Sequence, residues 1–374
     1  MDFLFNEHQL MFQKSARSFL QKYCTPDLVR KLQENDHPGH DVGLWNKIAD
    51  MGWIGLIFPE AYGGSGAQFM DLAIIYEEAG KVLLPTSFYS TIGGGLTVLN
   101  GGNEEQKHVV LPDVCLGKKM LSLAVYEPNS TLYRRTMATS AEKRDGGYVL
   151  NGTKMFVQNA HIADGLIVFA RTGPDSENIG AFLVEKNKLG VTCEPMLTFG
   201  KDKQSRIELQ QVFVPETLVL GKINQGKTIM RKTLTELTAL QCAEMVGGTQ
   251  AVLDKTIAYV KERKQFGQMI GSFQAVQHHL ARLAMDVDAA RYTTYQAVWS
   301  LDQGLSAVRE VAIAKSITGE AYKKVTLMAH QLHGGIGYAK EFDLYLWSQR
   351  AKATELSLGT RDDQLNIIAE EIEL

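Results

Sequence analysis

The chain has 374 residues, of which 45% are hydrophobic, so it is long enough for two or three domains with buried cores. Its 39 basic and 42 acidic residues give a formal net charge of -3, which argues against nucleic acid or an anionic membrane surface as the main partner. The N-terminus carries no signal-peptide pattern, and no apolar run approaches the ~20 residues that span a bilayer, so the sequence predicts a cytoplasmic location.

The first third of the chain, residues 1–118, is predicted to be a helical domain. Apolar side chains and flanking residues indicate helices over 9–21, 42–51, 69–84 and 103–116. The glycines within 58–66 permit backbone angles that other residues avoid, so this segment is predicted to be a turn.

The next segment, residues 119–225, is predicted to be a β-domain. Short β-rich runs separated by Gly, Asp and Asn are found at 147–150, 166–170, 181–184 and 207–214. The dipeptide Asn151-Gly152 is typical of hairpin turns, so we expect the strand 147–150 to end there. Several short strands joined by close turns favour a small barrel or sandwich.

The last segment, residues 226–374, is predicted to be a helical bundle. Four long helical stretches follow one another: 228–264, 274–301, 306–333 and part of 348–373. Gly247-Gly248 is expected to interrupt the first of them. The predicted fold class is therefore α+β and mostly helical, in the order helices, β-domain, helices.

Common signatures of other site types do not occur in this sequence. No GxGxxG follows a strand and no GxxxxGK[ST] occurs, so a dinucleotide fold or a P-loop is unsupported. His278-His279 has no suitably spaced Cys or carboxylate partners, and we expect no metal site there. The four cysteines are far apart, which is typical of reduced thiols.

Four short motifs, taken in order, resemble those of the acyl-CoA dehydrogenase family. They are Pro59-Glu-Ala-Tyr-Gly-Gly64, Tyr126-Glu-Pro128 with 151–159, Arg263-Lys-Gln-Phe-Gly267 with Phe273-Gln274, and Gln331-Leu-His-Gly-Gly-Ile-Gly337 with Gly359-Thr360. Each motif is weak alone, but their order and spacing cover nearly the whole chain. The resemblance implies an N-terminal helical domain, a middle β-barrel domain, a C-terminal four-helix bundle, and FAD as the cofactor.

In this family FAD lies between the β-domain and the bundle, and its adenosine end reaches a neighbouring subunit. Arg263 matches the arginine that meets the pyrophosphate, for which a guanidinium offers a planar fork of donors. The other positions matched to the cofactor are Tyr126, Phe156, Gln158, Phe266, Gln274 and Thr360, while Gln331 and Gly335 match residues that receive the adenine side of the partner's FAD.

Two departures concern the flavin side of the β-domain. Phe156 and Gln158 stand where the family usually has a Trp and a Thr beside the flavin ring. A phenyl ring can still pack on a flavin and an amide can still hydrogen-bond it. Asn129-Ser-Thr-Leu132 replaces the family's usual Gly-Ser-Asp stretch.

The larger departure concerns the catalytic base. The glutamate that takes the substrate α-proton very often directly precedes the Gly-Thr pair, and here that position is Leu358. Some relatives supply the glutamate from the first C-terminal helix, where Leu237 aligns and Glu236 is one residue away. Because one residue turns a helix by about 100 degrees, Glu236 should point elsewhere unless a local bulge redirects it. Weaker candidates are Glu355, Asp362 and Asp343.

Three segments resemble the small subunits of heteromeric pimeloyl-CoA-type and steroid-side-chain-type acyl-CoA dehydrogenases: Leu83-Leu-Pro-Thr-Ser87, Tyr126-Glu-Pro128 and Leu346-Trp-Ser-Gln-Arg350. A missing glutamate is expected in such a subunit. This resemblance implies a bulky, cyclic or dicarboxylic acyl-CoA substrate, a second acyl-CoA dehydrogenase-type subunit in a heterotetramer, and an electron-transferring flavoprotein as acceptor. Two alternatives stay open. One is a homotetramer with its base displaced to Glu236, and the other is a binding or scaffold protein without redox chemistry.

Overall fold

The computed structural model describes residues 5–128 and 137–374. The replaced stretch Asn129–Leu132 and the first four residues of the N-terminal segment therefore lie outside the described residues. The chain divides into two compact units, each built from separated segments. The first unit contains the residues up to Arg30, Gln68–Leu84 and Thr238–Leu374, and the second contains Lys31–Ala67 and Pro85–Leu237.

The first unit is helical. Its elements are α1 (Glu7–Tyr23), α4 (Phe69–Val82), the larger part of α7 (Gly226–Glu262), α8 (Gln274–Asp302), α9 (Val308–His333), α10 (Leu344–Leu356) and α11 (Arg361–Glu371). Side chains define where two of these helices begin. Asn6 accepts a hydrogen bond from the backbone of Gln9 at the start of α1, and Asp302 accepts from Phe69 and Met70 at the start of α4. The C-terminal segment predicted to contain one helix in fact contains two, α10 and α11.

The Gly247-Gly248 pair does not interrupt α7, contrary to the sequence-based prediction. A Cβ atom on Gly247 would lie 1.8 Å from the Glu77 carbonyl oxygen, and one on Gly80 would lie 1.9 Å from the Glu244 carbonyl oxygen. These glycines therefore allow the backbones of α4 and α7 to approach each other closely. The pattern marks a helix contact rather than a break.

The second unit combines short helices with a sheet. Its helices are α3 (Val42–Asp50), α5 (Ser87–Gly101) and α6 (Glu104–Cys115), together with the start of α7, while α2 (Pro26–Gln33) spans a boundary between the units. Helix α5 was not predicted, because it contains three consecutive glycines and its side chains are buried on all faces. A Cβ atom on Gly93 would lie 2.8 Å from Leu237, and one on Gly94 would lie 2.2 Å from Leu121. Glycine there permits close packing of α5 against α7 and the sheet.

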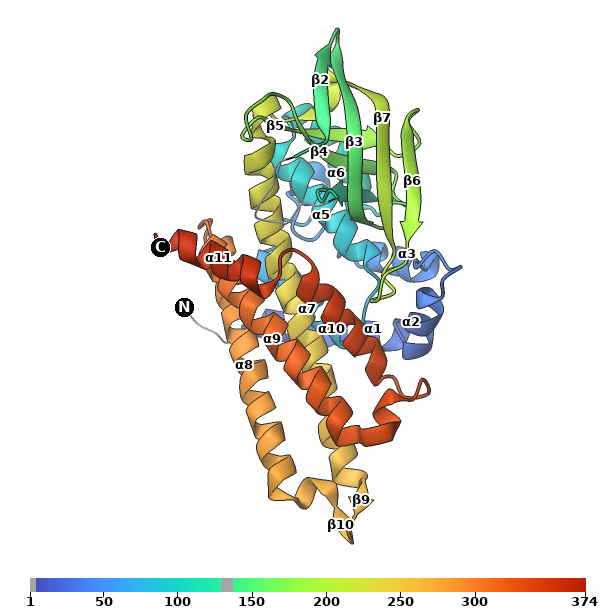
Figure 1. The fold of residues 1–374 in the computed structure, drawn as a ribbon, viewed down its shortest axis with the longest axis vertical. Coiled ribbons are helices and arrows are strands. Elements are labelled where there is room, and N and C mark those ends of the chain that lie inside the picture. Colours follow the sequence, from blue (N-terminus) through green and yellow to red (C-terminus); the bar gives the residue numbers. More distant parts are fainter. Residues whose placement is uncertain (1–4, 129–136) are drawn as a thin grey trace. The chain divides into compact units, whose positions relative to one another are not determined.

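The eight-stranded sheet has the order β6-β7-β3-β2-β4-β5-β8, with β1 paired to β4 (Figure 1). Its strands are β1 (Leu121–Ala124), β2 (Ser140–Arg144), β3 (Gly147–Gln158), β4 (Gly165–Arg171), β5 (Ile179–Glu185), β6 (Val191–Met196), β7 (Gln204–Pro215) and β8 (Val219–Leu220). Alternating apolar residues from these strands, including Leu150, Val168 and Val212, form its buried core.

Asn151-Gly152 is not a hairpin turn, and this prediction was wrong. Strand β3 continues through both residues, and the register of its pairing with β7 shifts between Leu150 and Gly152. The Asn151 side chain accepts a hydrogen bond from the backbone of Gln211 on β7, and Gly152 adopts φ +149. The dipeptide forms a β-bulge instead of a turn because it pairs with β7, a strand that is distant in the sequence.

The predicted order of helices, β-domain and helices is confirmed, as is the α+β, mostly helical fold class. Within the described residues, the structure contains no helix of the length and apolarity needed to cross a membrane.

Candidate functional site

In the second unit, three residues matched to the cofactor come together at the end of β3. The register of β3 against β7 shifts between Lys154 and Val157, and within this bulge Phe156 has φ +56 and is 50% exposed. Tyr126 pairs with the neighbouring Met155, whose backbone N–H donates to the Tyr126 carbonyl at 2.8 Å. Half-buried Gln158 ends the strand. A bulky residue at positive φ is strained by about 1–3 kcal/mol and is typical of functional sites.

A buried ion pair lies beside this strand, and sequence reasoning did not identify it. The Lys154 Nζ lies 2.6 Å from the Glu127 Oε1, and both side chains are almost fully buried. Glu127 also accepts hydrogen bonds from the backbone of Ala138 and Thr139. Burial acts to raise the pKa of Glu127, but Lys154 and these donors hold the pKa below its usual value. The pair anchors the segment that carries Tyr126.

In the first unit, the hairpin between α7 and α8 carries two of the matched residues. It consists of β9 (Lys264–Gln265) and β10 (Gln268–Met269), with Phe266 at φ +52 and Gly267 at φ +80 between them. Phe266 is 91% exposed, and its ring meets the ring of Phe273 edge-on, with a distance of 6.2 Å between the ring centroids. Arg263 is exposed and forms no ion pair with any described residue. Its guanidinium is therefore available to an anionic ligand. Gln274, also exposed, begins α8.

The turn after α9 packs against the last part of α7, which precedes this hairpin. It is a short 3-10 helix over Gly334–Tyr338, and Gly334 takes φ +62 and ψ -142, angles open essentially to glycine alone. The ring of His333 stacks on Tyr259 near the end of α7, at a centroid distance of 4.3 Å. No atom lies within 4 Å of a Cβ built on Gly334 or Gly335. Their backbone is thus open to a flat ligand, and Gln331 beside them is exposed.

A third turn, Ser357 to Thr360, joins α10 to α11. Leu358 is 6% exposed and has φ +56, and Gly359 has φ +96. The Leu358 carbonyl accepts a hydrogen bond from Gln364 Nε2 at 2.8 Å. Thr360 forms the N-cap of α11, and its hydroxyl donates to Asp363 at 2.8 Å. The residue directly before Gly359 is therefore fixed in an unusual conformation and presents an aliphatic side chain.

Glu236 and Leu237 face different parts of α5 in the second unit. Asn100 Nδ2 donates to Glu236 Oε2 at 2.7 Å, whereas the Leu237 side chain fills the space over Gly93. Burial raises the pKa of Glu236, against the effect of the Asn100 hydrogen bond. Helix α7 is continuous through both residues, so no bulge redirects Glu236.

The weaker candidates for the base have other partners or are exposed. Glu355 pairs with Lys352 at 2.6 Å, and Asp343 pairs with Arg30. Asp362 is exposed in the first turn of α11.

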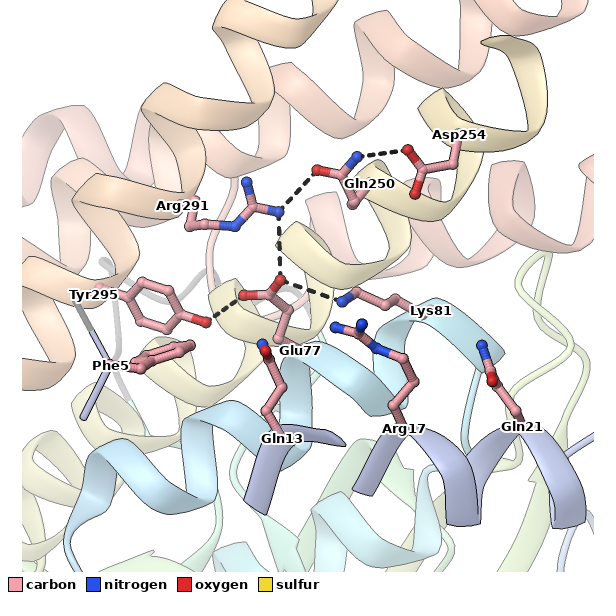
Figure 2. Close-up of a pocket in the computed structure, with 10 residues that line it drawn as sticks. All are labelled: Phe5, Gln13, Arg17, Gln21, Glu77, Lys81, Gln250, Asp254, Arg291 and Tyr295. Atoms are coloured by element: carbon pink, nitrogen blue, oxygen red, sulfur yellow. Dashed lines mark hydrogen bonds and ion pairs between the residues drawn. The ribbon is translucent and has the colours of Figure 1, made fainter. Parts of the chain in front are cut away.

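A cavity of about 510 Å³ opens in the first unit, but none of the predicted site residues lines it. Figure 2 shows Glu77 at its centre, where the carboxylate accepts from the Tyr295 hydroxyl and lies 3.3 Å from Arg291. The adjacent Glu78 binds Arg17 and Lys81 at 2.9 Å and 2.7 Å. Because Arg17, Lys81 and Arg291 are each paired with Glu77 or Glu78, the cavity is best explained as part of an ion-pair network that ties α1, α4 and α8 together.

Comparison with known proteins gives matches over almost the whole chain. The models of the acyl-CoA dehydrogenase N-terminal, middle and C-terminal domains match residues 6–118, 122–212 and 224–373. The probable acyl-CoA dehydrogenase YngJ of Bacillus subtilis (strain 168) is 33% identical, with 100% of both chains covered.

Two solved structures are informative. An FAD complex of PigA matches with a TM-score of 0.94 and 28% identity over 100% of both chains. The ChsE4-ChsE5 complex from Mycobacterium tuberculosis matches with a TM-score of 0.91 and 26% identity, over 100% of this chain and 99% of the other.

Proposed function

The chain belongs to the acyl-CoA dehydrogenase family, and from this premise we propose that it is the glutamate-lacking subunit of a heteromeric FAD-dependent acyl-CoA dehydrogenase. The observation that carries the proposal is Leu358, which occupies the position of the usual base in a well-fixed turn. One structural neighbour is itself a complex of two differently named chains, ChsE4 and ChsE5. That precedent supports a division of labour between two chains.

FAD is the cofactor typical of the family, and the exposed chemistry of this chain fits it. We assign the FAD pyrophosphate to the guanidinium of Arg263, and we assign the adenine side of a neighbouring subunit's FAD to the open backbone at Gly334-Gly335. Tyr126, Phe156 and Gln158 would contact the flavin ring. When bound, FAD supplies the acceptor for the hydride that leaves the substrate β-carbon.

The other half of the reaction is removal of the α-proton of the acyl thioester, for which a carboxylate in a dry pocket is an effective base. Leu358 can exclude water but cannot accept a proton. The partner subunit would supply the carboxylate. We further propose a bulky, cyclic or dicarboxylic acyl-CoA as substrate and an electron-transferring flavoprotein as acceptor.

Exposed apolar side chains support assembly with other subunits. Met285 and Tyr292 on α8 are 71% and 53% exposed, and Leu327 on α9 is 62% exposed. Tyr338, in the turn after α9, is 73% exposed. We take these exposed side chains of the first unit as the candidate interface surface. We propose that it is covered in a tetramer.

The second candidate is a homotetramer in which Glu236 is the base. Its support is the partial burial of Glu236, which raises the pKa of its carboxyl group, the direction that suits a general base. Against it, the side chain is directed toward Asn100 on a continuous helix.

The proposal is tested by purifying the chain alone and together with a co-expressed acyl-CoA dehydrogenase-type partner. Anaerobic bleaching of the flavin band at roughly 450 nm is then followed with a panel of acyl-CoA esters. We expect a yellow protein that is bleached only with the partner present. Full-rate bleaching of the lone chain contradicts the missing-base proposal, and a colourless preparation favours a non-redox binding protein.

A further inference from the structure

A lysine is buried inside the bundle without an acidic partner. Lys315 on α9 is 3% exposed and forms no ion pair with a described carboxylate, although Glu355 and Glu244 favour its charged form from a longer distance. Its Nζ donates to Gln241 Oε1 at 2.8 Å and to the Thr354 carbonyl, and it lies 3.9 Å from Met245 Sδ. An ammonium in such a place costs several kcal/mol of desolvation in general. Its hydrogen-bond partners therefore indicate which part of the structure it stabilises.

Lys315 holds the end of α10 and the residue that follows it. The Thr354 carbonyl belongs to the last turn of α10, where carbonyls lack intrahelical partners and a cation is favoured by the helix dipole. Because an ammonium can only donate, it fixes the Gln241 amide with its oxygen toward Lys315. The amide nitrogen must then point the other way, and it donates to Ser357 Oγ at 3.1 Å.

The turn that receives this bond contains the strained residue. Ser357 immediately precedes Leu358, whose φ of +56 is unfavourable for a branched aliphatic side chain. On the other side of Leu358, Gln364 donates to its carbonyl. The two glutamines thus bracket Leu358. Gln364 acts locally, from the following helix, and Gln241 transmits the position of Lys315.

We propose that Lys315 is a positioning residue: through Gln241 and Thr354 it fixes the turn that presents the side chain at position 358. A functional role for the side chain at position 358 rests on the proposed function, because only the family resemblance identifies this position as that of the base. The hydrogen bonds that fix the turn do not depend on the proposed function. The turn is therefore held by hydrogen bonds on both sides of Leu358.

Amide hydrogen exchange of the full-length protein tests the positioning role without substrate or partner. Lys315→Met removes the source of the bond. Gln241→Glu keeps an acceptor for Lys315, and in every experiment below it is made together with Ser357→Ala, because the Ser357 hydroxyl would otherwise donate to the new carboxylate and restore the bond. Thr326→Val is the matched control, because Thr326 is equally buried on α9 and bonds only within its own helix.

We expect exchange in residues 356–362 to accelerate about tenfold in both test variants, while the rest of α9 and α7 is unchanged and the control matches the wild type. Unchanged exchange at 356–362 in Gln241→Glu overturns the proposal. So does a uniform acceleration across the first unit, which indicates general destabilisation. Should Lys315→Met fail to fold, Gln241→Glu decides alone.

A functional arm uses Leu358→Glu with FAD bound. This variant should gain α-proton exchange with an acyl-CoA, and adding Gln241→Glu should lower kcat about tenfold while KM is unchanged. A gained activity that is indifferent to Gln241→Glu overturns the positioning role. A loosened turn combined with no gained activity contradicts the proposed function, and the hydrogen-exchange result then upholds the positioning role by itself.

Discussion

Raising the pH above 8 should strengthen the fold through Lys315. Burial lowers the pKa of Lys315 from 10.5 to about 8. In the unfolded chain the lysine keeps its proton up to pH 10.5, so between these values the unfolded state binds more protons. The free energy of unfolding therefore rises with pH across this window. Below pH 8 both states are protonated, and the desolvation penalty is present in full.

The size of the effect follows from the pKa difference, which is 10.5 minus about 8, or about 2.5 units. Each unit corresponds to about 1.4 kcal/mol, so the unfolding free energy gains at most about 3.5 kcal/mol. Neighbouring groups also titrate or carry charge. Burial raises the pKa of the Cys242 thiol to about 11, so titration of this thiol lowers the unfolding free energy as the pH rises above 9. Glu244 and Glu355 favour the charged form of Lys315. The comparison with Lys315→Met removes most of these contributions.

Urea unfolding at pH 7, 8, 9 and 10, followed by circular dichroism, measures the effect. The difference in unfolding free energy between wild type and Lys315→Met should be constant up to pH 8 and should then shift in favour of the wild type. A difference that stays flat over the whole range refutes the reasoning, because it means that Lys315 keeps its proton or is solvated in the folded protein.

Three other substitutions follow from the structure. Lys154→Met leaves the Glu127 carboxylate buried without its cation and should lower the unfolding free energy by about 3–5 kcal/mol. The control Lys143→Met removes an exposed pair with Glu216 and should cost less than about 1 kcal/mol. Urea unfolding measures both losses, and equal losses would contradict a stabilising role for the buried pair. Arg263→Gln should weaken FAD binding about tenfold or more in a fluorescence titration, and undiminished affinity excludes the pyrophosphate role. Glu236→Gln should leave turnover of the assembled enzyme unchanged, and loss of α-proton exchange in deuterated water revives Glu236 as the base.

Much of the fold could be predicted from the sequence because it depends on local patterns. The long helices α8 and α9 follow from the spacing of their apolar residues, and the β-rich middle follows from short runs such as 166–170. Helix α5 could not be found in this way, because its glycines are explained only by Leu237 and Leu121, which lie far away in the sequence.

The same limit applies to the site. Arg263 and the glycines at 334–335 are predicted from short motifs, and they are exposed in the structure, but their role toward FAD stays a prediction. The bulge at Asn151-Gly152 depends on Gln211, and the relay from Lys315 to Ser357 joins three separate helical segments. No periodicity or motif reports such pairings, so these features had to come from the structure.

The most direct test of the account is α-proton exchange by the purified chain alone, loaded with FAD, with an acyl-CoA in deuterated water. We predict no deuterium at the α-carbon until a partner with an intact carboxylate is added. Deuterium incorporation by the lone chain, at a rate equal to that of the assembled enzyme, would mean that a carboxylate of this same polypeptide performs the step.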